Sequence, residues 1–90
     1  MSTYRLIIST SLGKVFDGQV ERLTLRGAEG DLAILAGHVP LMTTVRPGTV
    51  SLVLPDGGRK EASCDGGLLT VGTGDTVALL EHFTWNASSL

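Results

Sequence analysis

Hydrophobic and polar residues alternate with a period of two along most of the chain, which is the pattern of half-buried β-strands. Short segments rich in glycine or proline separate the alternating stretches. No window carries an apolar stripe with a 3.6-residue period over helical length, so we expect no helix. The pattern predicts an all-β fold, an antiparallel β-sandwich or flattened barrel of about 8–10 short strands. The expected strands lie at residues 4–9, 22–26, 32–35, 41–45, 49–54, 59–64, 68–71 and 76–80, with a further one beginning at residue 15.

The stretch from Gly30 to Gly48 is the segment around which the rest of the prediction is arranged. It reads as an apolar strand, a break at Ala36–Gly37, a tight corner at residues 38–40 and a second apolar strand. Glycine permits positive φ at the break, whereas Pro40 fixes its own φ and pushes the residue before it towards extended geometry. We therefore expect a rigid strand–corner–strand unit that holds His38 at its corner.

Smaller features complete the expected topology. Asp17–Gly18 is a turn signal, as are residues 55–58 and 65–67. Val20 is out of phase with Leu23 and Leu25, which predicts a bulge or a change of sheet near Glu21. The segment from residue 81 onward carries two aromatic residues and then becomes rich in small and polar residues, so we interpret it as a tail.

Length and composition exclude several classes of protein. The 90 residues suffice for one small domain with a thin core. Basic residues are scattered and the net charge is −2, which argues against nucleic-acid binding. No apolar run is long enough to span a bilayer, and the N-terminus lacks the pattern of a signal peptide. The lone Cys64 cannot form an internal disulfide and suits a reducing compartment, so we expect a cytoplasmic location.

The low content of charged residues adds one positive indication. Only 18% of residues are charged, and the mean hydropathy is +0.26. Fewer charges than usual are therefore available to cover the surface. One interpretation is that a partner covers part of it.

Catalytic chemistry has little support in the sequence. His38 and His82 are the two histidines, and neither is accompanied by the spacing of a nucleophilic triad or a metal site. The Gly57–Gly58 and Gly66–Gly67 pairs precede no helix, so they predict turns and not a phosphate-binding loop. We expect no catalytic residue, cofactor or metal. His38 is then either a corner residue whose ring bonds nearby backbone or a contact residue at a partner surface.

Several motifs in sequence order resemble those of the epsilon subunit of F-type ATP synthases, called delta in mitochondria. Residues 30–48, GDLAILAGHVPLMTTVRPG, resemble the family signature G-[ED]-L-G-I-L-P-G-H-x-P-L-x-T…P-G. Residues 16–20, FDGQV, are similar to F-x-G-x-V, and residues 66–71, GGLLTV, to G-G-x-[LF]-x-V. Residues 29–32 and 77–80 also match in order. The resemblance covers residues 1–85 as an epsilon-type β-sandwich domain and leaves residues 86–90 as a short tail.

The resemblance implies a non-catalytic subunit of the central rotor stalk, coupling proton or sodium transport to ATP synthesis. It implies two partners, the gamma subunit and the membrane c-ring, and a peripheral place on the cytoplasmic side of the cell membrane. The expected c-ring contacts are Glu29, Gly30, Asp31 and His38, with His38 beside the acidic tip. The expected gamma contacts are Leu41, Met42, Thr43, Phe83 and Trp85.

Two departures from the family pattern qualify these expectations. Ala33 and Ala36 replace the Gly and Pro of G-I-L-P-G-H, which should relax the corner without destroying it. The sequence ends at Leu90, before the two-helix hairpin that family members carry, so we expect neither self-inhibition nor ATP binding by that element. A free-standing β-sandwich module that binds another protein or a small ligand is the alternative, and a small hydrolase using His38 is a third. The coupled ion stays open, as does a dimer formed through the uncovered partner face.

Overall fold

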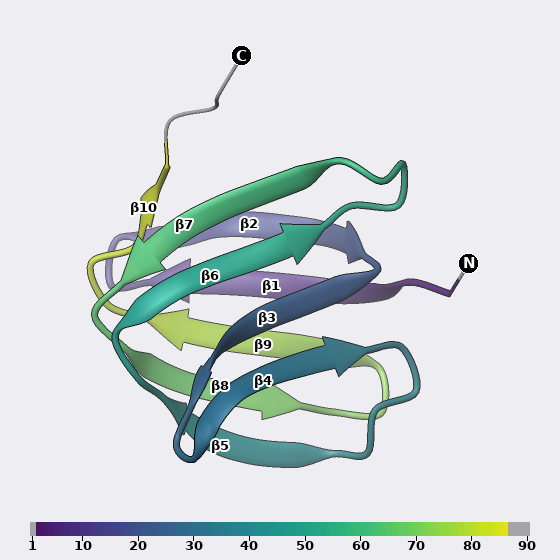
Figure 1. Ribbon diagram of the computed structural model, residues 1–90, viewed down its shortest axis with the longest axis horizontal. Helices are drawn as coiled ribbons and strands as arrows, with labels where there is room; N and C mark the ends of the chain where they lie inside the picture. Colours follow the sequence, from purple (N-terminus) through teal and green to yellow (C-terminus); the bar gives the residue numbers. More distant parts are fainter. Residues whose placement is uncertain (1, 87–90) are drawn as a thin grey trace.

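The computed structural model describes residues 2–86 and contains ten strands and no helix within that range (Figure 1). The strands are β1 (Tyr4–Thr10), β2 (Gly13–Val20), β3 (Arg22–Gly27), β4 (Gly30–Leu35), β5 (Leu41–Val45), β6 (Gly48–Val53), β7 (Arg59–Cys64), β8 (Gly67–Val71), β9 (Asp75–Leu80) and β10 (Thr84–Trp85). The all-β prediction is confirmed.

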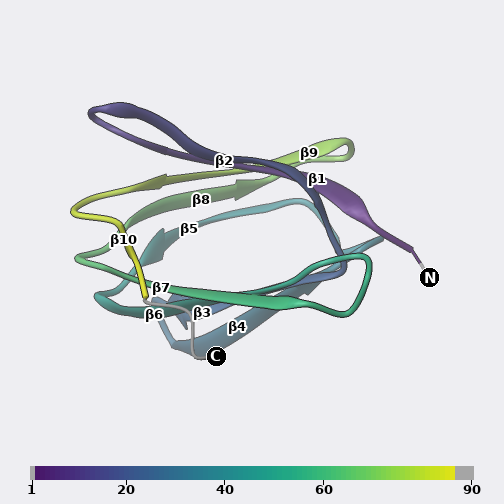
Figure 2. The same cartoon turned by 90° about the horizontal axis from the view of Figure 1, so that it is seen from above.

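The strands form two layers that belong to one curled sheet. Figure 2 shows β1, β2, β5, β8 and β9 on one side and β3, β4, β6 and β7 on the other. The hydrogen-bonded order is β10-β7-β6-β3-β5-β8-β9-β1-β2, with β4 paired to β3 alone. The layers join where β3 meets β5 through the single pair Gly27–Val45. This curled sheet is the predicted sandwich or flattened barrel.

The core lies between the layers because strict alternation turns one side chain in two inward. Each strand of β1, β3, β6, β8 and β9 contributes at least two fully or almost fully buried residues. The buried set is aliphatic and carries little polar surface, so its burial supplies the main favourable term in folding. It consists of Leu6, Ile8, Val20, Leu23, Leu25, Ile34, Val45, Val50, Leu52, Ala62, Cys64, Leu69, Val71, Ala78 and Leu80.

Aromatic side chains close the sheet where backbone pairing ends. The rings of Phe16 and Trp85 meet edge to face with centroids 6.2 Å apart, and Phe83 and Trp85 do so at 4.8 Å. The Lys60 Nζ atom lies 4.4 Å from the centre of the Trp85 ring. Because Phe16 belongs to β2 and Trp85 to β10, these contacts tie the two ends of the strand order together.

Three details differ from the expected topology. Asp17–Gly18 lies within β2, paired with Ile7 and Leu6, and is not a turn. The segment expected as a tail contains β10, whose two residues pair with β7. One pair, between β1 and β9, is parallel and not antiparallel. The alternation did not predict this, because a period of two is the same whatever the direction of the neighbouring strand.

The out-of-phase position of Val20 is explained by a change of layer. β2 ends at Val20, and the Glu21 amide donates to Val53 O of β6 at 2.7 Å as β3 begins in the other layer. The register irregularity of this part of the chain lies elsewhere, between Ile8 and Ser9 of β1. The predicted tail at 86–90 lies outside the described residues except for Asn86, whose amide donates to Glu61 O at 2.8 Å.

Candidate functional site

The outer face of β1, β5, β8 and β9 presents apolar side chains to solvent. Met42, Leu79 and Leu68 are 68%, 52% and 37% exposed, and the half-buried Val77 and Ile7 lie on the same side of the sheet. We call these five residues the apolar face. Strand register places them in neighbouring rows, which run from β5 to β1 as Thr44–Leu68–Leu79–Ser9 and Met42–Thr70–Val77–Ile7.

The outer face of the opposite layer has a different character. Most of its exposed positions are polar, including Arg22 and Arg26 on β3, Thr49 on β6 and Glu61 on β7. Among the described residues, Leu35, at the end of β4, is the large apolar side chain exposed there, at 52%. Both layers follow the same alternation, so the contrast lies in the residues chosen for the outward positions and not in the geometry. An exposed apolar cluster on one side of a small domain is typical of a protein-binding surface.

A compact group of charges borders the apolar face at β1, β2 and β9. The Arg5 Nε atom lies 3.0 Å from Asp17 Oδ1, and its Nη1 atom lies 3.3 Å from Asp75 Oδ2. Lys14 Nζ lies 2.8 Å from Asp17 Oδ2. Hydrogen bonds from Arg5 and Lys14 hold the pKa of the Asp17 carboxyl well below its usual range. Two cations and two carboxylates offset one another, so this border is close to neutral.

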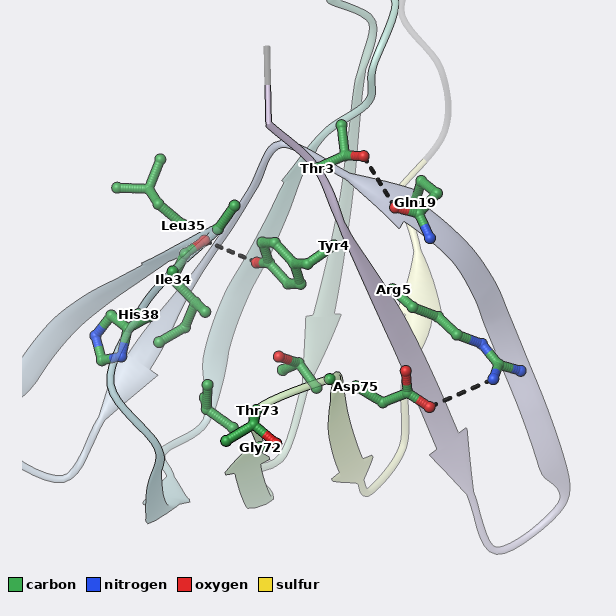
Figure 3. A pocket seen from close by; sticks show the side chains of 15 residues that line it. Thr3, Tyr4, Arg5, Gln19, Ile34, Leu35, His38, Gly72, Thr73 and Asp75 are labelled. Atoms are coloured by element: carbon green, nitrogen blue, oxygen red, sulfur yellow. Dashed lines mark hydrogen bonds and ion pairs between the residues drawn. The ribbon is translucent and has the colours of Figure 1, made fainter.

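A groove of about 450 Å³ opens at one end of the sandwich, where the start of β1, the β4–β5 corner and the β8–β9 turn converge (Figure 3). The Tyr4 hydroxyl crosses it and donates a 2.7 Å hydrogen bond to Ile34 O. Burial raises the pKa of the Tyr4 phenol, so the hydroxyl keeps its proton and this bond. The contact joins β1 of one layer to β4 of the other.

His38 lies at the rim of this groove, at the corner predicted for it. Its Nδ1 atom is 2.7 Å from Val39 O, so the ring bonds nearby backbone as the corner interpretation predicts. His38 is half-buried, and Figure 3 shows its ring pointing away from Tyr4. Over residues 2–86 no group of three or more His, Cys, Asp or Glu side chains is placed to hold a metal ion.

We expect removal of the Tyr4 hydroxyl to loosen the junction of the layers. Tyr4→Phe should lower the free energy of unfolding by about 1 kcal/mol, because Ile34 O loses a hydrogen-bond donor in a partly buried place. Urea denaturation followed by tryptophan fluorescence measures it. Thr3→Ala is the control, since its bond to Gln19 Oε1 at 2.9 Å is exposed and its loss should change little. Equal stabilities for the two variants would contradict the junction role.

Comparison with known proteins decides the family. Residues 3–85 match the β-sandwich domain of the ATP synthase delta/epsilon chain. The chain belongs to this family. This is the family that the sequence motifs resemble, and curated relatives support the same assignment.

Two of those relatives are epsilon chains. The chain is 40% identical over 83 residues to the sodium-ion-specific ATP synthase epsilon chain of Acetobacterium woodii, covering 92% of this chain and 62% of that protein. It is 37% identical over 81 residues to the ATP synthase epsilon chain of Bordetella petrii, covering 90% of this chain and 57% of that one. The chain therefore spans about 60% of the length of these relatives.

Solved structures show the same delta/epsilon fold. A chain in the OSCP/F1/c-ring structure of the Euglena gracilis mitochondrial ATP synthase matches with a TM-score of 0.88 and 21% identity, over 94% of this chain and 54% of that chain. A chain in the central stalk/c-ring structure from Tetrahymena thermophila matches with a TM-score of 0.72 and 16% identity, over 91% of this chain and 66% of that chain. At these identities the likeness shows the fold alone.

Against this delta/epsilon fold, the residues predicted for gamma contact fall into separate places. Met42 belongs to the apolar face, whereas Leu41 and Thr43 alternate to the other side of β5 and line a cavity of about 260 Å³ beside the β3–β4 turn. Phe83 and Trp85 belong to the aromatic cluster, formed with Phe16, that joins β10 to β2. The structure therefore does not bring the five together, because three consecutive strand residues cannot share one face.

The residues predicted for c-ring contact also divide. Glu29, Gly30 and Asp31 form the β3–β4 turn and the start of β4, where Asp31 Oδ1 lies 3.7 Å from Arg26 Nε. His38 follows the other end of β4, a six-residue strand about 20 Å long. The expectation that His38 lies beside the acidic tip is wrong. β4 starts at the acidic turn and ends at Leu35, so the corner that holds His38 follows the opposite end of this strand (Figure 1).

The outward residues of β8 and β9 are the part of the site that the residue-level prediction missed. Leu68, Val77 and Leu79 belong to segments in which both strand faces are apolar. That feature was visible in the sequence as consecutive apolar residues at 68–69 and 77–80, and it marks strands covered on both sides. No helix long and apolar enough to cross a membrane occurs among residues 2–86.

Proposed function

We propose that this chain is the β-sandwich of a non-catalytic central-stalk subunit of an F-type ATP synthase. In this role it couples proton or sodium transport to ATP synthesis by static binding to the gamma subunit and the c-ring. It is then a peripheral component on the cytoplasmic side of the cell membrane. Family membership supports the proposal, and the observation that carries it is the apolar face, an exposed surface suited to a permanent protein contact.

The apolar face is the proposed gamma-binding surface. Rows of aliphatic side chains across β5, β8, β9 and β1 form a broad, shallow surface and not a pocket. A surface of this kind fits the side of a long shaft subunit. The paired charges that border it at β1 and β2 can form the polar rim of the interface. This assignment keeps Met42 and replaces the other predicted gamma contacts with the outward residues of β8 and β9.

The c-ring contact is proposed along the length of β4. The Glu29–Asp31 turn and His38 mark the two ends of this strand, and β4 pairs only with β3 among the described strands. Carboxylates at one end and a half-buried histidine at the other suit polar loops through charge-assisted hydrogen bonds. A ring of such loops can meet both ends at once, which a single loop could not.

A non-catalytic role fits the chemistry of the groove. His38, the histidine that borders it, is engaged with Val39 O. The other polar side chains that line it are threonines, Tyr4, Gln19 and the Arg5–Asp75 pair. The strongly paired carboxylates, Asp17 and Asp75, are held by Arg5 outside it or at its edge. These contacts support a structural use of the groove residues.

Isothermal titration of the chain into the purified gamma subunit of the same organism tests the proposal. We expect one-to-one binding with a Kd below about 1 μM, because the apolar face offers a contact of the kind found in stable complexes. A heat-denatured sample of the chain is the control for non-specific heat. Absence of binding at micromolar concentration would contradict the stalk role and favour a free-standing binding module with another ligand.

A further inference from the structure

The β1–β2 hairpin carries a leucine at its tip. Leu12 is 97% exposed, more than any other large hydrophobic residue in the described part of the chain. Two-residue turns of this kind are usually polar, because a side chain at the tip gains nothing from the core. An aliphatic residue here adds exposed apolar area that the fold itself does not use.

The turn holds Leu12 in a defined place. The Leu12 amide donates to Thr10 Oγ1 at 3.0 Å, and that hydroxyl donates to Gly13 O at 3.3 Å. Gly13 adopts φ +120°, a backbone conformation that glycine permits, and pairs with Thr10 to close the hairpin. A side chain displayed on such an ordered turn loses little backbone freedom when a partner covers it.

The hairpin stands next to the apolar face. β1 pairs with β9 as far as Ser9–Leu79, and the hairpin continues beyond it by one residue pair, Thr10–Gly13, and the Ser11–Leu12 turn. A register irregularity between Ile8 and Ser9 lies close to the tip of the hairpin, and irregularities of this kind usually bend a strand pair. Figure 2 shows the hairpin rising away from the β3–β6–β7 layer, on the side where the apolar face lies.

The charges of the hairpin indicate what kind of surface it can meet. Lys14, the nearest cation along the chain, is paired with Asp17 at 2.8 Å. The tip, Ser11–Leu12, is uncharged, so it offers no attraction to nucleic acid or to acidic lipid headgroups. A protein surface with an apolar socket is the occupant that suits one projecting leucine beside a neutral border.

We infer that Leu12 is an anchor residue, which inserts into an apolar pocket of the same protein that covers the apolar face. The inference rests on the proposed function, so that protein is the gamma-type shaft subunit. The contact is then continuous from Met42 on β5 across Leu79 to the hairpin, with Leu12 at its margin. An aliphatic side chain buried in a socket at the margin of a contact contributes to register as well as affinity, because it fits only one place.

Titration of the Leu12→Ser variant into the gamma subunit tests this. We expect the Kd to rise by roughly 10- to 100-fold relative to the wild type, since a leucine side chain would no longer be buried. Ser11→Ala, at the adjacent exposed position, should bind as the wild type does. Urea denaturation of both variants should match the wild type, because neither side chain contacts the core.

The outcomes separate this inference from the proposed function. If the wild type binds gamma and Leu12→Ser binds equally well, the anchor role is overturned while the stalk role stands. If the wild type fails to bind, the stalk role and the anchor role fall together. Sedimentation equilibrium of the chain alone adds a third outcome: a wild-type dimer that Leu12→Ser dissociates would show that the socket lies on a second copy and would overturn the assignment to gamma.

Discussion

Gly67→Ala should destabilise the domain more than any other substitution considered for it. Gly67 opens β8 with φ +153° and pairs with Val45 on one side and Leu80 on the other. A Cβ atom added here would collide with the backbone carbonyl of Leu79 and would lie 2.9 Å from the Leu80 Cα atom. Because the obstacle is backbone inside a three-strand junction, relief requires separating β8 from β9.

We expect a loss of at least about 4 kcal/mol, a large part of the 5–15 kcal/mol that stabilises a typical domain. Thermal denaturation followed by circular dichroism measures it. Gly30→Ala is the matched control, since Gly30 has a similar φ of +132° but a Cβ there would meet nothing within 4 Å. That control should cost about 1–2 kcal/mol from backbone strain alone. Similar melting temperatures for the two variants would show that the close approach at Gly67 is unimportant.

The positions of the strands could be predicted because the residues within each strand and its flanking turns specify it. Alternation at residues 22–26 and 49–52 places leucine and valine inward and arginine, threonine or serine outward, and the structure follows it. Glycine and proline marked the turn at 55–58, where the Leu54 amide donates to Gly58 O at 2.8 Å. Local signals of this kind require no knowledge of the partner strand.

Pairing partners and strand direction could not be predicted in the same way. The parallel β1–β9 pair joins residues about 70 positions apart, such as Arg5 and Asp75, and no local pattern specifies it. Asp17–Gly18 resembled a turn because turn signals describe short-range preference. In the structure Asp17 is instead held in β2 by Arg5 and Lys14, and the Phe16 ring lies over Gly18. Tertiary contacts therefore override the local preference.

The candidate site likewise has one part that local residues predict and one part that depends on strand pairing. The His38 corner depended on local residues, and a ring bonded to nearby backbone was one of the two interpretations of His38. The apolar face depends on which strands stand side by side. Consecutive apolar residues marked Leu68 and Leu79 in the sequence, but only the order of β5, β8, β9 and β1 shows that they share one face. Grouping Leu41, Met42 and Thr43 by sequence ignored the two-residue period that sends Met42 outward alone.

A charge in the middle of the apolar face should abolish binding to gamma while leaving the fold intact. Leu79 is 52% exposed and lies between Leu68 of β8 and Ser9 of β1, so Leu79→Asp places a carboxylate where the proposed partner would cover it. An unpaired charge buried in an interface costs far more than the lost leucine contact. We expect the Kd for gamma to rise at least about 100-fold in isothermal titration.

Thr49→Asp is the matched control, because Thr49 is an exposed strand residue on the polar outer face of the other layer. Both variants should unfold within about 1 kcal/mol of the wild type in urea, since each new carboxylate is solvated in the free chain. Only Leu79→Asp should lose gamma binding. If Thr49→Asp abolishes binding and Leu79→Asp does not, the partner covers β3, β6 and β7, and the low charge of the apolar face has another cause. The comparison thus decides which of the two outer faces of the sandwich meets the shaft, by means of one carboxylate placed on each.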